Sequence, residues 1–164
     1  MFVGIITTNI GNIMNSEYER KFLLVGYPHI FDLFKMERIK QWYISRPEDL
    51  IEVRIRLYDD GRCYVDFKKG FGMERYEHGF KCLYDDVKHL TEGVPFVEKD
   101  RFKLRTDEYL LIVDEFTDGL RLVEIESNSV EFIKNFVPFD WMGLEVTDNL
   151  HYTNNWLAWN KEKR

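Results

Sequence analysis

The sequence predicts a mainly β protein of the α+β type, in which about eight strands form a largely antiparallel sheet that can close into a barrel. Three observations support this fold class. Aromatic residues make up 16% of the 164 residues and hydrophobic residues 45%, a composition that suits strands. Short runs of alternating apolar and polar residues follow one another along the chain. Gly, Asp and Asn separate these runs, as they do at hairpin turns.

The first strand is expected at Glu17–Val25, and a short helix with Pro28 near its start follows it. Turns at Asp59-Asp60-Gly61 and Asp118-Gly119 join two of the later strand pairs. The remaining strands are expected at 38–45, 51–58, 62–69, 73–81, 96–104, 109–116 and 120–127. Helices are expected at 28–36, 83–90 and 129–136, and a C-terminal helix at 151–164.

One domain accounts for the length of the chain, because no repeat, low-complexity tract or linker rich in Pro or Ser divides it. We expect this domain at residues 16–164. Residues 1–15 form an N-terminal extension that is either disordered or an added strand. The extension lacks a basic n-region, and its apolar run is too short for a signal peptide or a membrane span.

The composition also limits the possible partners. A net charge of −6 argues against a surface that binds a nucleic-acid duplex, which requires a basic excess.

Cys63 and Cys82 are too few and too far apart in sequence for a CxxC metal site or a disulfide framework. We expect both to be buried, reduced thiols in a cytoplasmic protein. A monomer and a homodimer are equally compatible with the sequence.

Full charges share one face of nearly every predicted strand. In the first strand Glu17, Glu19 and Lys21 occupy every second position, so their side chains point to the same side. A solvated sheet face explains one such strand, but solvated faces usually mix in Ser, Thr, Asn and Gln. The other charges of this kind are Arg54 and Arg56, Lys68, Arg75 and Glu77, Lys99 and Arg101, Asp114, and Glu124 and Glu126.

If the sheet closes, these charges line its interior, where an uncompensated charge is costly. We therefore expect an occupant, without which the charges would lack partners. Paired carboxylates favour a hard divalent cation, Mg²⁺ or Mn²⁺. Clustered Arg and Lys favour a polyanion such as a chain of phosphates. Asp66 and Lys103 are expected at the rim of this interior.

The segment Glu17-Tyr18-Glu19-Arg20-Lys21 matches the ExExK pattern that begins the first strand of the CYTH superfamily, the triphosphate tunnel metalloenzymes. The charged positions given above follow in the family's order, and the chain resembles the family from residue 16 to residue 158. The resemblance implies an eight-stranded antiparallel barrel. Its tunnel would bind a triphosphate compound together with one or two divalent ions.

The resemblance also implies roles for individual residues. The metal ligands would be Glu17, Glu19, Asp114, Glu124 and Glu126, which with Lys21 form the catalytic set. The phosphate-binding residues would be Lys21, Arg54, Arg56, Lys68, Arg75, Lys99 and Arg101. Glu77 and His151 are further possible site residues. The implied chemistry is attack of a metal-activated water on the terminal phosphorus.

Three positions depart from the pattern of many relatives. An acid two residues after Glu77 is replaced by Gly79, an acid two residues before Asp114 is replaced by Ile112, and an Arg-Tyr pair is replaced by His151-Tyr152. Because two carboxylates are missing, we expect the second ion to load more weakly than the first.

Three functions are consistent with these features. The favoured one is metal-dependent hydrolysis of the terminal phosphate of a triphosphate compound, with inorganic triphosphate favoured over a nucleoside triphosphate or thiamine triphosphate. The alternatives are a class IV-type adenylate cyclase, which needs a base pocket at the tunnel mouth, and a protein that binds polyphosphate or nucleotides without turnover. Gly79 and Ile112 favour the last of these.

Overall fold

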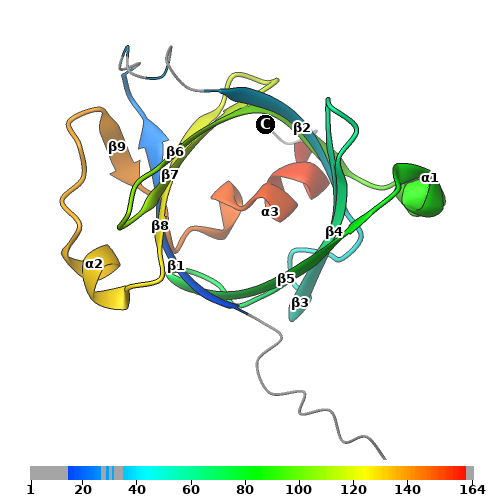
Figure 1. Ribbon diagram of the computed structural model, residues 1–164, viewed down its shortest axis with the longest axis horizontal. Coiled ribbons are helices and arrows are strands. Elements are labelled where there is room, and N and C mark those ends of the chain that lie inside the picture. The colour runs from blue at the N-terminus through cyan, green and yellow to red at the C-terminus, as the bar shows by residue number, and fades with distance from the viewer. Residues whose placement is uncertain (1–14, 27–28, 30, 32–34, 162–164) are drawn as a thin grey trace, which may run out of the picture.

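The computed structural model describes residues 15–26, 29, 31 and 35–161. Eight of its strands form a closed antiparallel ring in the order β5-β4-β3-β2-β6-β7-β8-β1, and β1 also pairs with β5 (Figure 1). The predicted fold class is confirmed. The strands are β1 (Asn15–Leu24), β2 (Met36–Tyr43), β3 (Ile51–Tyr58), β4 (Cys63–Lys69), β5 (Glu74–Cys82), β6 (Phe96–Arg105), β7 (Leu110–Phe116) and β8 (Arg121–Ser127).

A ninth strand, β9 (Met142–Glu145), lies outside the ring and was not predicted from the sequence. It pairs with the second half of β1, whereas β5 pairs with the first half. Arg20 anchors β9 because its guanidinium donates to both carboxylate oxygens of Glu145, at 2.9 and 2.8 Å. A run of four residues that pairs with a strand far away in sequence leaves no local periodic signal.

The helices are short. The segment expected at 83–90 divides into α1 (Tyr84–Val87) and the 3₁₀ turn η2 (Lys88–Thr91), and α2 (Val130–Asn135) lies within the helix expected at 129–136. Of the expected helix at 28–36, residues 28, 30 and 32–34 lie outside the described residues, and its expected end is wrong because Met36 begins β2. Of the extension 1–15, residues 1–14 lie outside the described residues. No helix in the described part of the chain has the length and apolar character needed to cross a membrane.

The C-terminal helix is shorter than expected. A 3₁₀ turn, η3 (Leu150–Tyr152), precedes α3 (Asn154–Trp159), which begins where the Thr153 hydroxyl accepts a hydrogen bond from the backbone N–H of Trp156. In Figure 1, α3 lies within the ring. Leu157 and Ala158 pack there against apolar side chains of β2, β6, β7 and β8. The helix therefore fills part of the barrel.

Two further apolar clusters cover the outside of the barrel. One lies on the outer faces of β1, β7 and β8 and includes Ile133 of α2. The other lies on β2, β3 and β4, with side chains of α1 packed against it. Because the apolar residues of most strands are used outside the ring, their alternate residues, which are largely charged, point inward.

Candidate functional site

The barrel contains a cavity of about 340 Å³ with a strongly charged lining. Residues from seven strands and from α3 line it, and they include ten of the residues that the sequence singles out. These ten are Glu17, Glu19, Arg54, Arg56, Lys68, Arg75, Glu77, Arg101, Glu124 and Glu126. Lys21, Lys99 and Asp114 are buried just beneath this lining. His151 is exposed and does not line the cavity; its ring lies 4.5 Å from that of Trp156.

Three carboxylates converge on one side of the cavity. Neighbouring positions of β1 and β8 place Glu19 opposite Glu126 and Lys21 opposite Glu124. Glu19, Glu124 and Glu126 can each offer one oxygen such that all three lie within 4.8 Å of one another. Burial, followed by the negative charges of Glu19 and Glu124, raises the pKa of Glu126 to about 8. Acids crowded in this way are stabilised by a shared cation.

Two cations contact this acidic cluster. The Lys21 ammonium lies 2.8 Å from Glu124 and 3.8 Å from Glu19, and the Arg75 guanidinium lies 2.9 Å from Oε1 of Glu19. That oxygen is nevertheless buried without a hydrogen bond from any described residue. The donor set therefore fits a divalent cation, since three acidic side chains meet and one buried oxygen still lacks a hydrogen bond.

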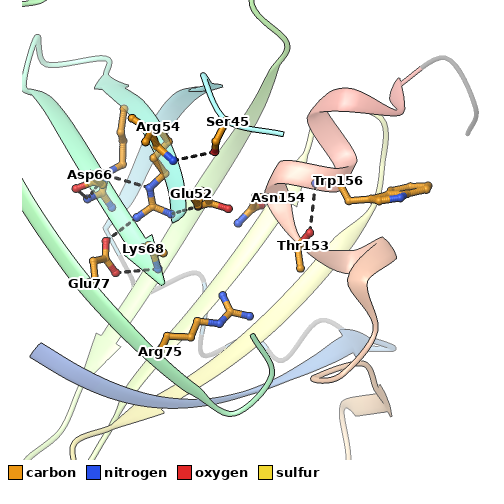
Figure 2. A network of polar contacts seen from close by, with 12 residues as sticks. Ser45, Glu52, Arg54, Asp66, Lys68, Arg75, Glu77, Thr153, Asn154 and Trp156 are labelled. Carbon is orange, nitrogen blue, oxygen red and sulfur yellow. Dashed lines mark hydrogen bonds and ion pairs between the residues drawn. The ribbon is translucent and has the colours of Figure 1, made fainter. Parts of the chain in front are cut away.

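Basic side chains from β3, β4 and β5 form the part of the wall that begins beside β1 (Figure 2). Arg54 pairs with Glu77 at 2.7 Å, and Lys68 pairs with the other carboxylate oxygen of Glu77 at 2.8 Å. Burial opposes ionisation of Glu77, but Lys68 and Arg54 together hold its pKa far below the ordinary value. The carboxylate therefore stays ionised and holds both cations in place.

A third group of charges lies on β6 and β7. Asp114 is 1% exposed and accepts hydrogen bonds from Arg101 at 2.6 and 2.7 Å and from Lys99 at 2.6 Å. Lys99 also donates to the side chain of Asn154 on α3, at 3.1 Å. Burial, followed by the charge of Arg101, lowers the pKa of Lys99 to about 7. Asp114 thus contacts two basic residues and lies outside the group of three converging carboxylates.

These contacts correct one expectation. We expected the interior charges to lack partners unless a ligand filled the barrel, and this is wrong: acidic and basic side chains from neighbouring strands pair with one another. The alternation of charge along each strand is visible in the sequence, but the register that brings opposite charges together is not.

Comparisons with known proteins identify the family. An inorganic triphosphatase of Nitrosomonas europaea is 33% identical over 150 residues, which cover 87% of this chain and 97% of that protein. An inorganic triphosphatase of Acetivibrio thermocellus is 31% identical over 157 residues, which cover 92% of this chain and 97% of that protein. No family model matches the chain.

The chain belongs to the CYTH superfamily. A crystal structure of an inorganic triphosphatase aligns with a TM-score of 0.61 at 30% identity, covering 87% of this chain and 93% of that one. A conserved protein from Pyrococcus furiosus, at 23% identity, shares the fold with a TM-score of 0.59 and covers 72% and 83% of the two chains.

The two departures from the CYTH pattern within the strands have different surroundings. Ile112 is buried, lines the cavity and lies opposite Glu124 across β7 and β8. Gly79 lies opposite Asp66 across β4 and β5. Asp66 was expected at the rim, which is wrong, because it is 2% exposed and pairs with two arginines. Lys103 does line the cavity.

Two polar residues of β2 also point into the barrel and are not predicted by the pattern of charged strand faces. Gln41 lies opposite Arg56 and Tyr43 lies opposite Arg54, so both point into the barrel. Both are fully buried, and no described residue hydrogen-bonds the Gln41 amide. A single glutamine and a tyrosine on one strand carry no distinctive sequence signal, and only the register places them beside the arginines.

Proposed function

We propose that the protein hydrolyses the terminal phosphoanhydride bond of inorganic triphosphate in a reaction that depends on Mg²⁺ or Mn²⁺. The observation that carries this proposal is one cavity lined both by an acidic cluster on β1 and β8 and by arginines and a lysine on β3, β4 and β5. The two inorganic triphosphatases that are 33% and 31% identical along nearly the whole chain support the same substrate.

In the proposed reaction the oxygen of a water molecule attacks the terminal phosphorus, the bridging P–O bond breaks, and orthophosphate and diphosphate are released. Glu19, Glu124 and Glu126 would hold the first ion, and Glu17 and Asp114 would lie near a second. A bound divalent ion supplies charge neutralisation at phosphate oxygens and lowers the pKa of bound water. Two carboxylates of the family pattern are absent, so the second ion should load more weakly.

The chain's own cations would bind and orient the phosphates. Arg54, Arg56 and Arg101 line the cavity and present planar forks that match phosphate oxygens, while Lys68 and Arg75 add charge close to the acidic cluster. Lys21 would stay near Glu124 and Glu19, where it reaches both the metal ligands and the substrate. Lys99 acts from beneath the lining through Asp114 and Asn154.

The test is phosphate release from inorganic triphosphate, ATP, GTP and thiamine triphosphate, each with Mg²⁺ and with Mn²⁺. We expect the fastest release from inorganic triphosphate, and its loss in Glu19→Ala and Lys21→Ala. Glu115→Gln is the control, because Glu115 lies next to Asp114 but on the other face of β7. Unchanged release in both of the first two variants would refute the proposal.

The same assay separates the alternatives. A cyclase would convert ATP to cyclic AMP and diphosphate, without free orthophosphate. A protein that only binds its ligand would give a calorimetric binding signal with inorganic triphosphate and no product with either metal ion.

A further inference from the structure

The buried carboxylate of Asp66 contacts two arginines of the cavity wall and does not itself line the cavity. Nε of Arg54 donates to one carboxylate oxygen at 3.0 Å (Figure 2). A terminal nitrogen of Arg56 donates to the other oxygen, also at 3.0 Å. Arg54 and Arg56 line the cavity, whereas Asp66 does not and is almost completely buried. The carboxylate therefore contacts the two side chains that would contact phosphate, from the side away from the ligand.

Gly79 leaves the space that this carboxylate occupies. It lies directly opposite Asp66 in the β4–β5 register. A Cβ atom at position 79 would lie 2.3 Å from Oδ1 of Asp66 and 3.4 Å from the carbonyl oxygen of Val65. Among the described glycines, those with positive φ do not include Gly79, so its backbone conformation is open to other residues. A larger residue at position 79 would therefore displace the Asp66 carboxylate from the place where it contacts the two arginines.

Arg54 also pairs with Glu77, whereas Asp66 contacts both arginines. They are two residues apart on β3, so their like charges point the same way and repel. A carboxylate between them offsets this repulsion and fixes the orientation of both guanidinium groups before any ligand arrives. Nε of Arg56 remains buried without a hydrogen-bond partner among the described residues, so this arginine keeps a donor for a further acceptor.

We propose that Asp66 is a positioning residue that pre-orients Arg54 and Arg56 for phosphate binding, and that Gly79 is the space it requires. The inference rests on the proposed function in so far as these arginines bind the phosphates of the substrate. Because the side chains are already held in their bound orientation, they lose less conformational entropy when the ligand binds. In this interpretation Gly79 of β5 and Asp66 of β4 act together, because the absence of a side chain at position 79 makes room for the Asp66 carboxylate.

Removal of the Asp66 carboxylate changes the affinity for triphosphate, and the direction of this change shows whether Asp66 positions the arginines or only contributes negative charge. If Asp66 acted only through its negative charge, its removal would tighten binding of a polyanion. If it positions the arginines, its removal weakens binding despite the gain in positive potential. The two roles therefore predict opposite changes in the same measurement.

The experiment combines a double-mutant cycle with direct binding. The dissociation constant of inorganic triphosphate is measured by titration calorimetry without metal, and kcat and KM are measured with Mg²⁺, for Asp66→Ala, Gly79→Ala and the double variant. We expect Asp66→Ala to weaken binding by at least about tenfold and to raise KM more than it lowers kcat. Gly79→Ala should act in the same direction and add almost nothing in the Asp66→Ala background.

Asp100→Ala is the matched control. Asp100 also accepts two hydrogen bonds from one arginine, Arg38, at 2.8 and 2.9 Å, but this pair is on the outside of the barrel. The Asp100→Ala substitution should leave the binding of triphosphate unchanged. If Asp66→Ala does not fold, as judged by near-UV circular dichroism, Asp66→Asn keeps the side-chain volume and is expected to weaken binding as well.

Tighter or unchanged binding in Asp66→Ala and Asp66→Asn would overturn the inference, and so would fully additive losses in the double variant. The proposed function fails separately, if the unmodified protein binds inorganic triphosphate but releases no phosphate from it. In that case the calorimetric cycle still tests the role of Asp66.

Discussion

Asp114→Asn should destabilise the protein strongly, because this carboxylate compensates two buried cations. It accepts hydrogen bonds from Arg101 and Lys99 at 2.6 to 2.7 Å, and all three side chains are less than a tenth exposed. Removing one partner of a buried ion pair typically costs about 3–5 kcal/mol, because the remaining charge stays buried and uncompensated. Total stabilities are only about 5–15 kcal/mol, so this loss is large.

The assay is urea unfolding at pH 7 without metal, supported by thermal melting. For a chain of this size, 3–5 kcal/mol corresponds to a melting temperature lowered by roughly 6–20 °C. Inorganic triphosphate should restore more stability to the variant than to the unmodified protein, since Arg101 lines the cavity and can exchange the lost carboxylate for phosphate oxygens.

Glu115→Gln removes a neighbouring charge from the other face of β7 and should change the free energy of unfolding by less than about 0.5 kcal/mol. A loss below about 1 kcal/mol in Asp114→Asn would refute the reasoning, because Lys99 and Arg101 would then be compensated by other groups. An equal gain from triphosphate in both proteins would refute the exchange of partners at Arg101.

Three other predictions follow from single features. Burial and the adjacent Cys82 raise the pKa of Cys63 to about 12. In a Cys82→Ser variant the contribution of burial remains, so at pH 8 Cys63 should react with Ellman's reagent much more slowly than a free thiol, and normally once unfolded. Arg20→Ala removes the bonds to Glu145 and should accelerate amide hydrogen exchange in β9, whereas unchanged exchange would show that β9 is held otherwise. Ile112→Asp places a carboxylate opposite Glu124 and should add a second calorimetric Mn²⁺ site; two equally tight sites in the unmodified protein would contradict this.

The period-two alternation of apolar and charged residues was sufficient to predict about eight strands in a largely antiparallel sheet, and the family resemblance implied that the sheet closes into a barrel. In β3, for example, Arg54 and Arg56 alternate with apolar residues, as a strand between an apolar exterior and a polar interior requires. The pairing of β1 with β5 that closes the ring depends on contacts between distant segments. The position of β9 also depends on contacts with a distant segment, because this strand has no hairpin partner and is anchored to β1 by Arg20.

The same alternation predicted which charges point inward, but not which of them are partners. Asp66 illustrates the difference, because its inward position follows from the pattern in β4. Its burial depends on the register that sets it against Arg54 and on the space left by Gly79. Gln41 and Tyr43 show the opposite case. Their inward position was not predicted, because they are neutral and the predicted interior residues were those with full charges.

The paired interior changes how ligand recognition must work in this barrel. Arg54, Lys68 and Arg101 already have carboxylate partners, so a phosphate chain gains affinity only from the difference between its contacts and those it replaces or supplements. A single orthophosphate reaches few of these cations at once and cannot offset that loss. A chain of three phosphates reaches cations on several strands together, and a divalent ion held by Glu19, Glu124 and Glu126 would offset its remaining charge. Internal pairing therefore favours long polyanions over short ones, in addition to holding the empty barrel together.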